Sequence, residues 1–255
     1  MHCSSYKIIE KKAISENIFS FEIYCPEVAE EAKCGQFVHI RVPSCTLRRP
    51  ISICEVNRAD GTLRIVFEIR GAGTEKLAEL NKGDFIDMIA PLGNGFTVKE
   101  LPEGKRVIVV GGGIGVPPMF QTAKSYKKAT AILGFRSFDR VILKRDFEVN
   151  GIETIICTDD GSVGYHGVVS DPLSSELEKG DVGAVFACGP KPMLASVMQL
   201  AKEHGVFCEI SLEERMACGV GACVGCVCRI MRGGEEKLLR VCKDGPVFNA
   251  EEVIL

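Results

Sequence analysis

Four cysteines near the end of the chain have a spacing that can hold an iron–sulfur cluster. Cys218, Cys223 and Cys226 form a C-x4-C-x2-C pattern, and fifteen residues separate Cys226 from Cys242. Thiolates at this spacing are typical ligands of a [2Fe–2S] cluster. Zinc sites more often pair two C-x2-C turns, whereas Cys242 stands alone. The pattern therefore predicts a [2Fe–2S] cluster on these four cysteines, with zinc as the weaker alternative.

Glycines fill the gaps between these ligands. Gly219, Gly221 and Gly225 can adopt positive φ, which would bring main-chain N–H groups towards the cluster sulfurs. A fifth cysteine, Cys228, lies two residues beyond Cys226. We expect its side chain to point away and to take no part, and its use as a ligand is the open alternative.

Two glycine-rich turns could accept a dinucleotide. The motif GGGIGVPP at 111–118 follows the apolar run RVIVV directly, and CGPKPM occupies 188–193. Glycines between a strand and a helix let a pyrophosphate approach main-chain N–H groups at the helix N-terminus. The first motif departs from G-x-G-x-x-G, and a tight turn without a ligand is the alternative. The second turn favours the nucleotide, because both would lie at the carboxyl edge of a parallel sheet.

Three motifs in the first hundred residues suit a flavin. They are RRPISI at 48–53, GAGT at 71–74 and PLGNGF at 91–96. Arg49 can pair with a phosphate, and Ser52 can hydrogen-bond a ring nitrogen or carbonyl. The GAGT motif opens a helix whose first turn can cap another phosphate. Together these motifs predict a flavin held beside a nucleotide domain.

The composition limits the class of protein. The chain has 255 residues, 46% of them hydrophobic and 25% charged, and a net charge of −3. This balance gives no basic field for nucleic acid or an anionic membrane. No apolar run is long enough to span a membrane, and the first residues lack the apolar stretch of a signal peptide. Thirteen cysteines without an export signal suit a reducing compartment. We therefore expect a cytoplasmic protein in which Cys54, Cys157 and Cys208 are buried hydrophobic residues.

The rhythm of apolar residues predicts three parts. Residues 1–100 contain five short strand-like runs between turn residues, namely IFSFEIYC, GQFVHIRV, PISICEV, TLRIVFEI and DFIDMIAP, which indicates an antiparallel β-barrel for FAD. The one helix predicted here is TEKLAELNKG, ended by Gly83. Residues 101–212 alternate apolar strands with helices, one of them predicted over DRVILKRDFE at 139–148, which indicates an α/β nucleotide-binding domain with a parallel sheet. Residues 213–255 lose this periodicity and form the [2Fe–2S] module. The fold class is thus a multi-domain chain of barrel, α/β domain and small cluster module.

The histidines are assigned no chemistry. We expect His39, in the run GQFVHIRV, to lie on the surface of a strand. His204 lies in the last turn of the final predicted helix, before Gly205, and is expected on the surface. His166 follows Tyr165 in a glycine-rich loop and receives no role.

These motifs, in this order, resemble those of the ferredoxin–NADP⁺ reductase superfamily. Within it the chain is most similar to the electron-transfer subunits of type B, NAD-linked dihydroorotate dehydrogenase, and the likeness covers nearly the whole chain. The segments ERMACGVGACVGC and VCKDGPVF match the cluster module of that family. Some related subunits carry Asp as the first cluster ligand, so Cys218 favours the dihydroorotate family.

The resemblance implies a role for individual residues. The FAD isoalloxazine and phosphate would be held by Arg49, Pro50, Ile51 and Ser52. The flavin would be lined by Val66, Phe67 and Glu68, and its pyrophosphate held by Gly73 and Thr74. The nicotinamide nucleotide would be accepted by Gly111, Gly112, Gly113, Gly115 and Gly189. Cys188 would lie near the nicotinamide ring.

The resemblance also implies a function. The chain would pass electrons from an FMN-containing catalytic subunit through [2Fe–2S] and FAD to NAD⁺, in pyrimidine biosynthesis. It would need that partner, as a hetero-oligomer such as a heterotetramer, because no segment supplies a dihydroorotate pocket. The alternative is a diaphorase subunit of another complex, namely a ferredoxin:NADP⁺ oxidoreductase, a sulfide dehydrogenase or a hydrogenase. A zinc or nucleotide-sensing module is a third. The resemblance implies NAD(H) as the nucleotide. The alternative is NADP(H), whose 2′-phosphate could be bound by Arg136, Ser137 and Arg140.

Overall fold

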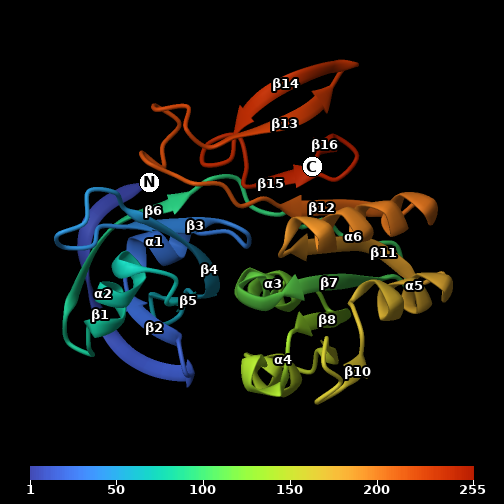
Figure 1. Ribbon diagram of the computed structural model, residues 1–255, viewed down its shortest axis with the longest axis horizontal. Coiled ribbons are helices and arrows are strands. Elements are labelled where there is room, and N and C mark those ends of the chain that lie inside the picture. Colours follow the sequence, from blue (N-terminus) through green and yellow to red (C-terminus); the bar gives the residue numbers. More distant parts are fainter. The chain divides into compact units, whose positions relative to one another are not determined.

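The computed structural model describes residues 1–255 throughout (Figure 1). Its internal contacts divide the chain into two compact units. The first unit consists of Met1–Gly95, Glu213–Cys228 and Leu238–Pro246. The second unit consists of Phe96–Leu212, Arg229–Lys237 and Val247–Leu255. The C-terminal segment therefore contributes to both units, and the predicted boundaries at 100/101 and 212/213 remain a prediction.

The first unit is built on a closed barrel of six antiparallel strands in the order β1-β2-β5-β4-β3-β6. The strands are β1 (His2–Ser15), β2 (Ile18–Tyr24), β3 (Phe37–Ile40), β4 (Arg49–Asn57), β5 (Thr62–Glu68) and β6 (Phe85–Leu92). Two short helices accompany them, α1 (Pro26–Glu31) and α2 (Ala72–Glu79). This barrel confirms the fold predicted for the first part of the chain. Because the barrel is closed, none of its strands has an unpaired edge.

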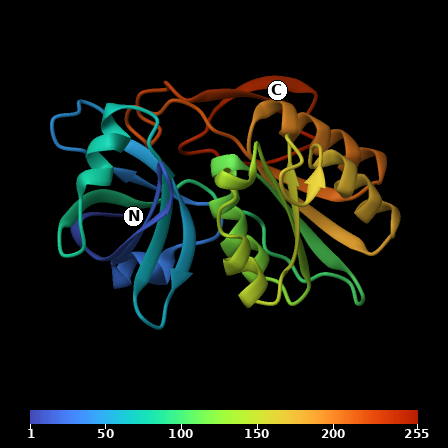
Figure 2. The same ribbon diagram turned by 60° about the horizontal axis from the view of Figure 1, so that its bottom comes forward.

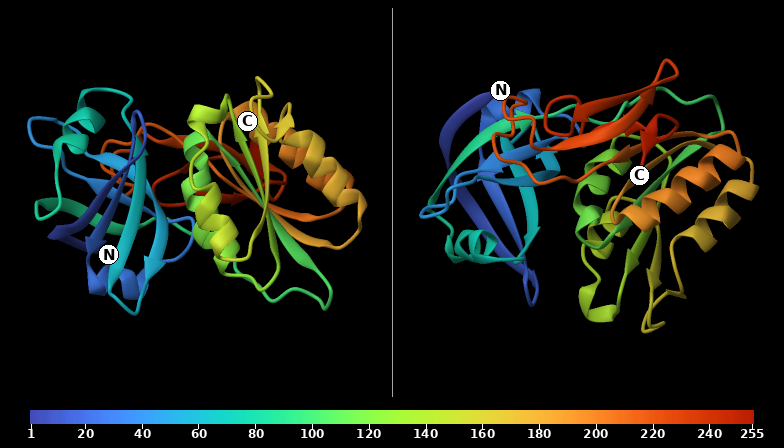
Figure 3. Two further views of the ribbon diagram at one scale, coloured as in Figure 1. Left: turned by 90° about the horizontal axis from the view of Figure 1, so that it is seen from below. Right: turned by 45° about the horizontal axis from the view of Figure 1, so that its top comes forward.

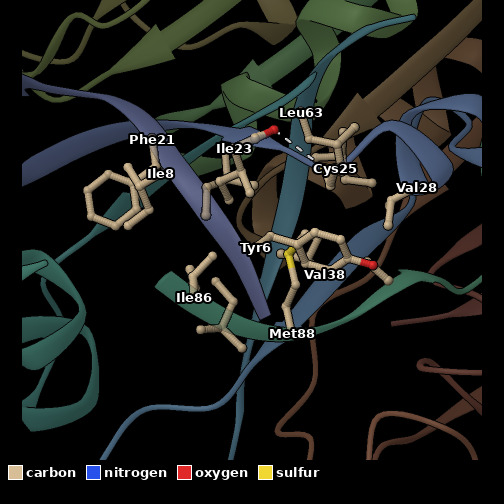
Figure 4. Packing of buried hydrophobic residues seen from close by; sticks show 14 of the residues in the cluster. Tyr6, Ile8, Phe21, Ile23, Cys25, Val28, Val38, Leu63, Ile86 and Met88 are labelled. Atoms are coloured by element: carbon tan, nitrogen blue, oxygen red, sulfur yellow. Dashed lines mark hydrogen bonds between the residues drawn. The ribbon is translucent and has the colours of Figure 1, made fainter. Parts of the chain in front are cut away.

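Alternating apolar residues fill the barrel (Figure 4). Phe21 and Ile65 are paired across β2 and β5, and both are fully buried. The rings of Phe21 and Phe67 meet edge to face with centroids 5.1 Å apart. Each such side chain contributes about 1.5–3 kcal/mol by leaving water. Cys25 is also buried here, and its thiol donates to the Ile23 carbonyl at 3.4 Å.

The second unit is built on a seven-stranded sheet in the order β10-β9-β8-β7-β11-β12-β15. Its strands are β7 (Arg106–Gly112), β8 (Ala129–Phe135), β9 (Glu153–Thr158), β10 (Tyr165–His166), β11 (Val182–Cys188), β12 (Phe207–Ser211) and β15 (Val247–Asn249). All neighbours are parallel except β12 and β15, which are antiparallel. This confirms the predicted parallel-sheet domain. The chain runs outward from β7 through β8, β9 and β10, then returns to β11 on the other side of β7.

Helices cover both faces of this sheet, as connections between parallel strands require. Figure 2 and the left panel of Figure 3 show α3 (Val116–Lys124) and α4 (Lys144–Val149) on one face. They show α5 (Ser170–Glu178) and α6 (Lys191–Glu203) on the other. Single turns of 3-10 helix occupy η1 (Gly113–Gly115) and η2 (Phe138–Arg140). None of these helices combines the length and apolar character needed to cross a lipid bilayer.

The C-terminal segment has more regular structure than its sequence suggests. It forms β13 (Val227–Arg232), β14 (Glu235–Arg240) and β16 (Val253–Ile254), in the order β14-β13-β16. The hairpin of β13 and β14 is visible in the right panel of Figure 3. Most side chains of this hairpin are exposed, so the apolar alternation that marks a buried strand is absent.

Two other expectations for local structure were wrong. The run 139–148 was predicted as one helix, but η2 and α4 are separated at Val141–Leu143, where Leu143 has φ of 60°. Gly83 was expected to end α2, yet α2 ends at Glu79 and Gly83 lies in the turn before β6. Gly205, with φ of 63°, does follow the C-terminal residue of α6 as predicted. Cys54, Cys157 and Cys208 are buried, also as predicted.

Arg106, the first residue of β7, connects this strand to neighbouring elements of the second unit through its guanidinium. Its guanidinium makes two bonds to Asp181, at 2.9 and 3.0 Å, one to Glu176 at 2.7 Å and one to the Thr130 hydroxyl at 2.7 Å. Burial opposes ionisation of Glu176, but its bonds to Lys179 and Arg106 outweigh burial and lower its pKa. The bond from Arg106 likewise lowers the pKa of Asp181.

Candidate functional site

The four predicted cluster ligands lie in the first unit as two linked pairs. The main-chain N–H of Cys223 donates to the sulfur of Cys218, and that of Cys242 donates to the sulfur of Cys226, both at 3.4 Å. The N–H of Gly221 reaches the Cys242 sulfur at 3.1 Å. No three His, Cys, Asp or Glu side chains converge as ligands of a single ion. Two irons that each take two thiolates suit this pairing.

The surroundings of the sulfurs favour negative charge at one end of this set. Burial opposes ionisation of Cys218, but the N–H groups of Cys223 and Val220 outweigh burial and lower its pKa to about 6. Burial, reinforced by the neighbouring Cys226 thiol, raises the pKa of Cys242 to about 12. Main-chain N–H donors directed at sulfur are the groups that stabilise a thiolate-bound cluster. The residues present therefore fit a [2Fe–2S] cluster.

The turns between the ligands differ from prediction at one place. Gly219 and Gly221 have φ of 71° and 84°, as expected, but Gly225 does not adopt positive φ. Its neighbour Val224 does so instead, with φ of 56°. A β-branched residue rarely adopts this conformation. Glycine content alone could not reveal that the left-handed turn falls on the valine.

Arg240 connects the two ligand segments. Its guanidinium makes two bonds to Asp244, at 2.8 and 3.0 Å, and one to the Gly221 carbonyl at 3.1 Å. The main-chain N–H of Arg240 also donates to the Asp244 carboxylate at 2.8 Å. The turn that carries Cys242 is thus fastened to the loop that carries the other ligands.

The PLGNGF motif contacts the same turn. Asn94 donates from its main-chain N–H to the Gly245 carbonyl at 2.6 Å. Its side-chain amide donates to the carbonyls of Lys243 and Asp244 at 3.2 and 3.0 Å. A Cβ on Gly93 would lie only 2.5 Å from Cδ of Pro246, so this glycine permits the contact. A motif assigned to the flavin therefore also supports the cluster segment, and sequence reasoning missed this role.

Cys228 lies outside the linked pairs. It is half-buried in β13, and its thiol donates to the Leu239 carbonyl at 3.5 Å. Burial first, and then the charge of Glu214, raise its pKa to about 11. These contacts support the proposal that Cys228 is a bystander.

The proposed flavin residues lie at the start of β4 and the start of α2. Arg49, Pro50, Ile51 and Ser52 open β4 and are half-buried. A Cβ on Gly73 would collide with the guanidinium of Arg49, so the two residues lie in direct apposition. Gly73 is in the first turn of α2, where free N–H groups attract anions. This cradle suits a pyrophosphate. Thr74 accepts the N–H of Arg70 at 2.8 Å and donates to the Gly71 carbonyl at 3.0 Å.

The β5 residues proposed to line the flavin differ in exposure. Val66 and Phe67 are buried, and the Phe67 ring packs on Phe19 and Phe21. Glu68 is half-buried and pairs with Arg70 at 2.8 Å. Because the Phe67 ring packs inside the barrel, only the main chain of this residue could contact a flavin.

The two glycine turns of the second unit lie together, as predicted. Cys188 at the end of β11 is in register with Gly111 at the end of β7. A Cβ on Gly115 would collide with the Cys188 carbonyl, and one on Gly112 would lie 2.7 Å from the Met193 sulfur. Gly113 lies in η1 and Gly189 directly follows Cys188. Strand order reverses between β7 and β11, and that reversal is where α/β sheets bind nucleotides.

The residues considered for a 2′-phosphate have an acidic neighbour. Ser137 donates its hydroxyl to Asp139 at 2.5 Å, and Arg140 lies 3.9 Å from the same carboxylate. The Asp139 carboxylate places a negative charge beside Ser137 and Arg140, and this charge disfavours binding of a phosphate there. Tyr165 and His166 are exposed, and the Tyr165 hydroxyl donates to Asp171 at 3.0 Å.

The expectation for His39 was wrong, because its side chain is fully buried rather than exposed. It lies against Gly219 of the cluster loop. His204 is exposed as predicted, and its Nδ1 lies 2.9 Å from the Leu200 carbonyl.

A closed barrel with a flavin cradle, a doubly wound nucleotide sheet and a paired cysteine set together define an iron–sulfur flavoprotein oxidoreductase. Comparisons with known proteins agree. Residues 5–96 match the oxidoreductase FAD-binding domain, and residues 213–254 match the iron-sulfur cluster binding domain of dihydroorotate dehydrogenase B. A ferredoxin NADP⁺ reductase from Neisseria gonorrhoeae shares the fold with a TM-score of 0.66 at 18% identity, covering 84% of this chain and 94% of its own.

Closer relatives narrow the class. The dihydroorotate dehydrogenase B (NAD(+)) electron transfer subunit of Bacillus caldolyticus is 40% identical over 255 residues, 97% of each chain. That of Enterococcus faecalis is 40% identical over 258 residues, again 97% of each. An NADH-dependent reduced ferredoxin-NADP oxidoreductase structure has a TM-score of 0.84 at 33% identity, covering 98% of this chain and 89% of the other. The chain belongs to the family of dihydroorotate dehydrogenase B electron transfer subunits, which confirms the resemblance seen in its motifs.

Proposed function

We propose that this chain is the electron transfer subunit of an NAD-linked dihydroorotate dehydrogenase and acts in pyrimidine biosynthesis. It delivers to NAD⁺ the electrons that an FMN-containing catalytic subunit removes from dihydroorotate. A [2Fe–2S] cluster exchanges single electrons, nicotinamide takes a pair as hydride, and FAD can do both. Relatives of this name that match 97% of the chain support the proposal.

Each group of residues has a distinct task. Cys218, Cys223, Cys226 and Cys242 hold the cluster. Arg49 and the first turn of α2 bind the flavin pyrophosphate. The turns after β7 and β11 bind the nicotinamide nucleotide, with buried Cys188 at their junction.

The observation that carries this proposal is the contact between the cluster segments and the flavin barrel within one unit. Gly219 lies against His39 of β3, and Asn94 bonds to the turn after Cys242. The strand β4, which pairs with β3, begins with the proposed flavin residues. Packing of the proposed cluster residues and the proposed flavin residues in one unit supports electron exchange between the two groups.

The partner is proposed to dock over the cluster loop. Val220 and Val224, which flank Cys223, expose 38% and 58% of their surface. Cys223 is itself exposed. Apolar side chains beside a redox centre suit a protein partner that must approach it closely. The complex is accordingly a hetero-oligomer.

Reconstitution tests the proposal. The purified chain, loaded with FAD, iron and sulfide, is mixed anaerobically with the FMN subunit of a type B dihydroorotate dehydrogenase. We expect dihydroorotate-dependent reduction of NAD⁺ that neither protein performs alone. If both loaded proteins bind each other but produce no NADH, the proposal is wrong.

A second candidate is a diaphorase subunit of another redox complex. The 33% identity with an NADH-dependent reduced ferredoxin-NADP oxidoreductase favours it. Reduction of ferredoxin by NADH in the absence of any dihydroorotate subunit would support this second function. An anaerobic visible spectrum separates both from a zinc module, because zinc-loaded protein without flavin would be colourless.

A further inference from the structure

His39 is an imidazole of β3 whose side chain is 0% exposed. Neither ring nitrogen makes a hydrogen bond of acceptable geometry, although main-chain groups lie near the ring. Buried polar groups in folded proteins are nearly always paired, so an unpaired ring points to a group that completes it. His39 is opposite Pro50 of β4, in the motif proposed to hold the flavin.

The ring lies between that motif and the cluster loop. A Cβ on Gly219 would collide with Nδ1, so the Nδ1 edge of the ring faces this glycine. The main chains of Cys218 and Arg48 approach the same ring. Arg48 holds the strand in place, since Nη1 donates to the His39 carbonyl at 3.3 Å and to the Asp87 carboxylate at 2.7 Å.

The ring can donate a hydrogen bond whatever its charge. An imidazole carries an N–H on at least one ring nitrogen in either protonation state. His39 can therefore offer a donor towards the cluster loop.

We propose that His39 supplies an N–H donor from the flavin barrel to the Cys218 end of the cluster site, and so positions the cluster loop and sets the cluster's potential. The ligand class is the electron-rich sulfur of an iron–sulfur centre, whose potential depends on hydrogen bonds to its sulfurs. Gly219 is required at its position because a side chain there would displace the ring. This inference rests on the proposed cluster ligands.

Three substitutions of His39 distinguish a role of its N–H donor from a role of its ring in packing. His39→Asn keeps an N–H close to the position of Nδ1, whereas His39→Gln moves it towards the position of Nε2. His39→Leu fills the space without a donor. The control is His166→Leu, which removes an exposed imidazole from the second unit. FAD, iron and sulfide contents are measured first, followed by the midpoint potential from a titration monitored by electron paramagnetic resonance.

We expect the Leu variant to keep its FAD and to show a more negative cluster potential than the wild type. Its iron should pass to a chelator about fivefold faster, the loss expected for one hydrogen bond. His39→Asn should restore both values, and His39→Gln should not. Gly219→Ala, which keeps the imidazole but displaces it, should shift the potential in the same direction as His39→Leu.

Each contrary result has a separate meaning. A wild-type chain that binds no iron and sulfide would overturn the ligand set, and this inference with it. A loaded wild type and a loaded Leu variant with equal potentials would overturn the role of His39 alone. Equal shifts in the Asn, Gln and Leu variants would show that His39 acts through packing only, which also contradicts the proposal.

Discussion

Asn94 and Gly245 are joined by a main-chain hydrogen bond of 2.6 Å, which connects the end of the flavin barrel to the turn after Cys242. The side chain of Asn94 strengthens this connection with bonds to two further carbonyls. The cluster segment is thus fastened to the barrel by the same motif that the sequence associates with the flavin.

Replacing Asn94 by Ala should loosen the cluster without removing the flavin. Two exposed hydrogen bonds are lost, at a cost of about 1 kcal/mol, so iron release to a chelator should be about fivefold faster. The FAD content should be unchanged. Asn150→Ala is the control, since that side chain bonds to Asp146 at 2.8 Å at the end of α4. Equal release from both variants would contradict the role of Asn94.

Replacing Gly73 by Ala should weaken FAD binding. The new Cβ would force the Arg49 guanidinium away from the first turn of α2. A charged hydrogen bond to phosphate contributes about 1.5–3 kcal/mol, so affinity should fall at least about tenfold. Fluorescence titration of the apoprotein with FAD compares the variant with the wild type, and equal affinities would exclude this cradle.

Replacing Cys223 by Ser should remove the cluster, whereas Cys228→Ser should leave it. The main-chain N–H of Cys223 donates to the Cys218 sulfur, whereas the Cys228 thiol donates to the Leu239 carbonyl. Iron and sulfide analysis with the visible spectrum distinguishes the two variants. Loss of the cluster in Cys228→Ser and its retention in Cys223→Ser would reverse the proposed ligand assignment.

Acid should destabilise the second unit through Glu176 and Asp181. Their pKa values are lower in the folded protein, so both add stability at neutral pH. This stability begins to be lost as pH falls through about 4, where the unfolded carboxyls take up protons, and is gone below the folded pKa values. Denaturation by urea at several pH values measures the slope.

Arg106→Met should flatten that slope, because it removes the partner that the two carboxylates share. It should also cost about 3 kcal/mol at neutral pH, since Glu176 remains largely buried. Arg145→Met, at an exposed position of α4, serves as the control. An unchanged acid dependence in Arg106→Met would show that other carboxylates cause it.

Replacing Asp139 by Asn should improve the use of NADPH. The carboxylate that binds Ser137 and faces Arg140 would no longer repel a 2′-phosphate. We expect kcat/KM for NADPH to rise about fivefold, with little change for NADH. Asp146→Asn in α4 is the control. A rise of the same size in that variant would indicate a general charge effect.

Local patterns were sufficient to predict the barrel and the parallel sheet and to single out the four cysteines, but not how these cysteines are linked in pairs. The cysteine motif and the glycine turns consist of residues that are close in the sequence, so their spacing alone indicates which ligand they could bind. The failure at His39 has a specific cause. Alternation along β3 correctly places His39 on the outer face, opposite buried Val38 and Ile40. That face is covered by Gly219, 180 positions later, and no local pattern reveals such a contact.

The long first strand β1 was missed for a related reason. Only Tyr6, Lys7 and Ile8 of this strand alternate clearly between buried and exposed positions, and the charged residues EKK follow at 10–12. Its register is set by pairing with β2 and β6, which lie on its two sides in the barrel. The role of Asn94 was hidden in the same way, because its partners lie at the other end of the chain.

The division of the C-terminal segment between the two units limits how the protein could be dissected. Residues 213–228 and 238–246 belong to the barrel unit, while β15 completes the edge of the nucleotide sheet beside β12. Excising everything after residue 212 would therefore do more than delete a redox centre. It would also strip the outer neighbour from β12 and leave the main-chain groups of that strand free to pair with another molecule, so that a truncated reductase core would tend to self-associate.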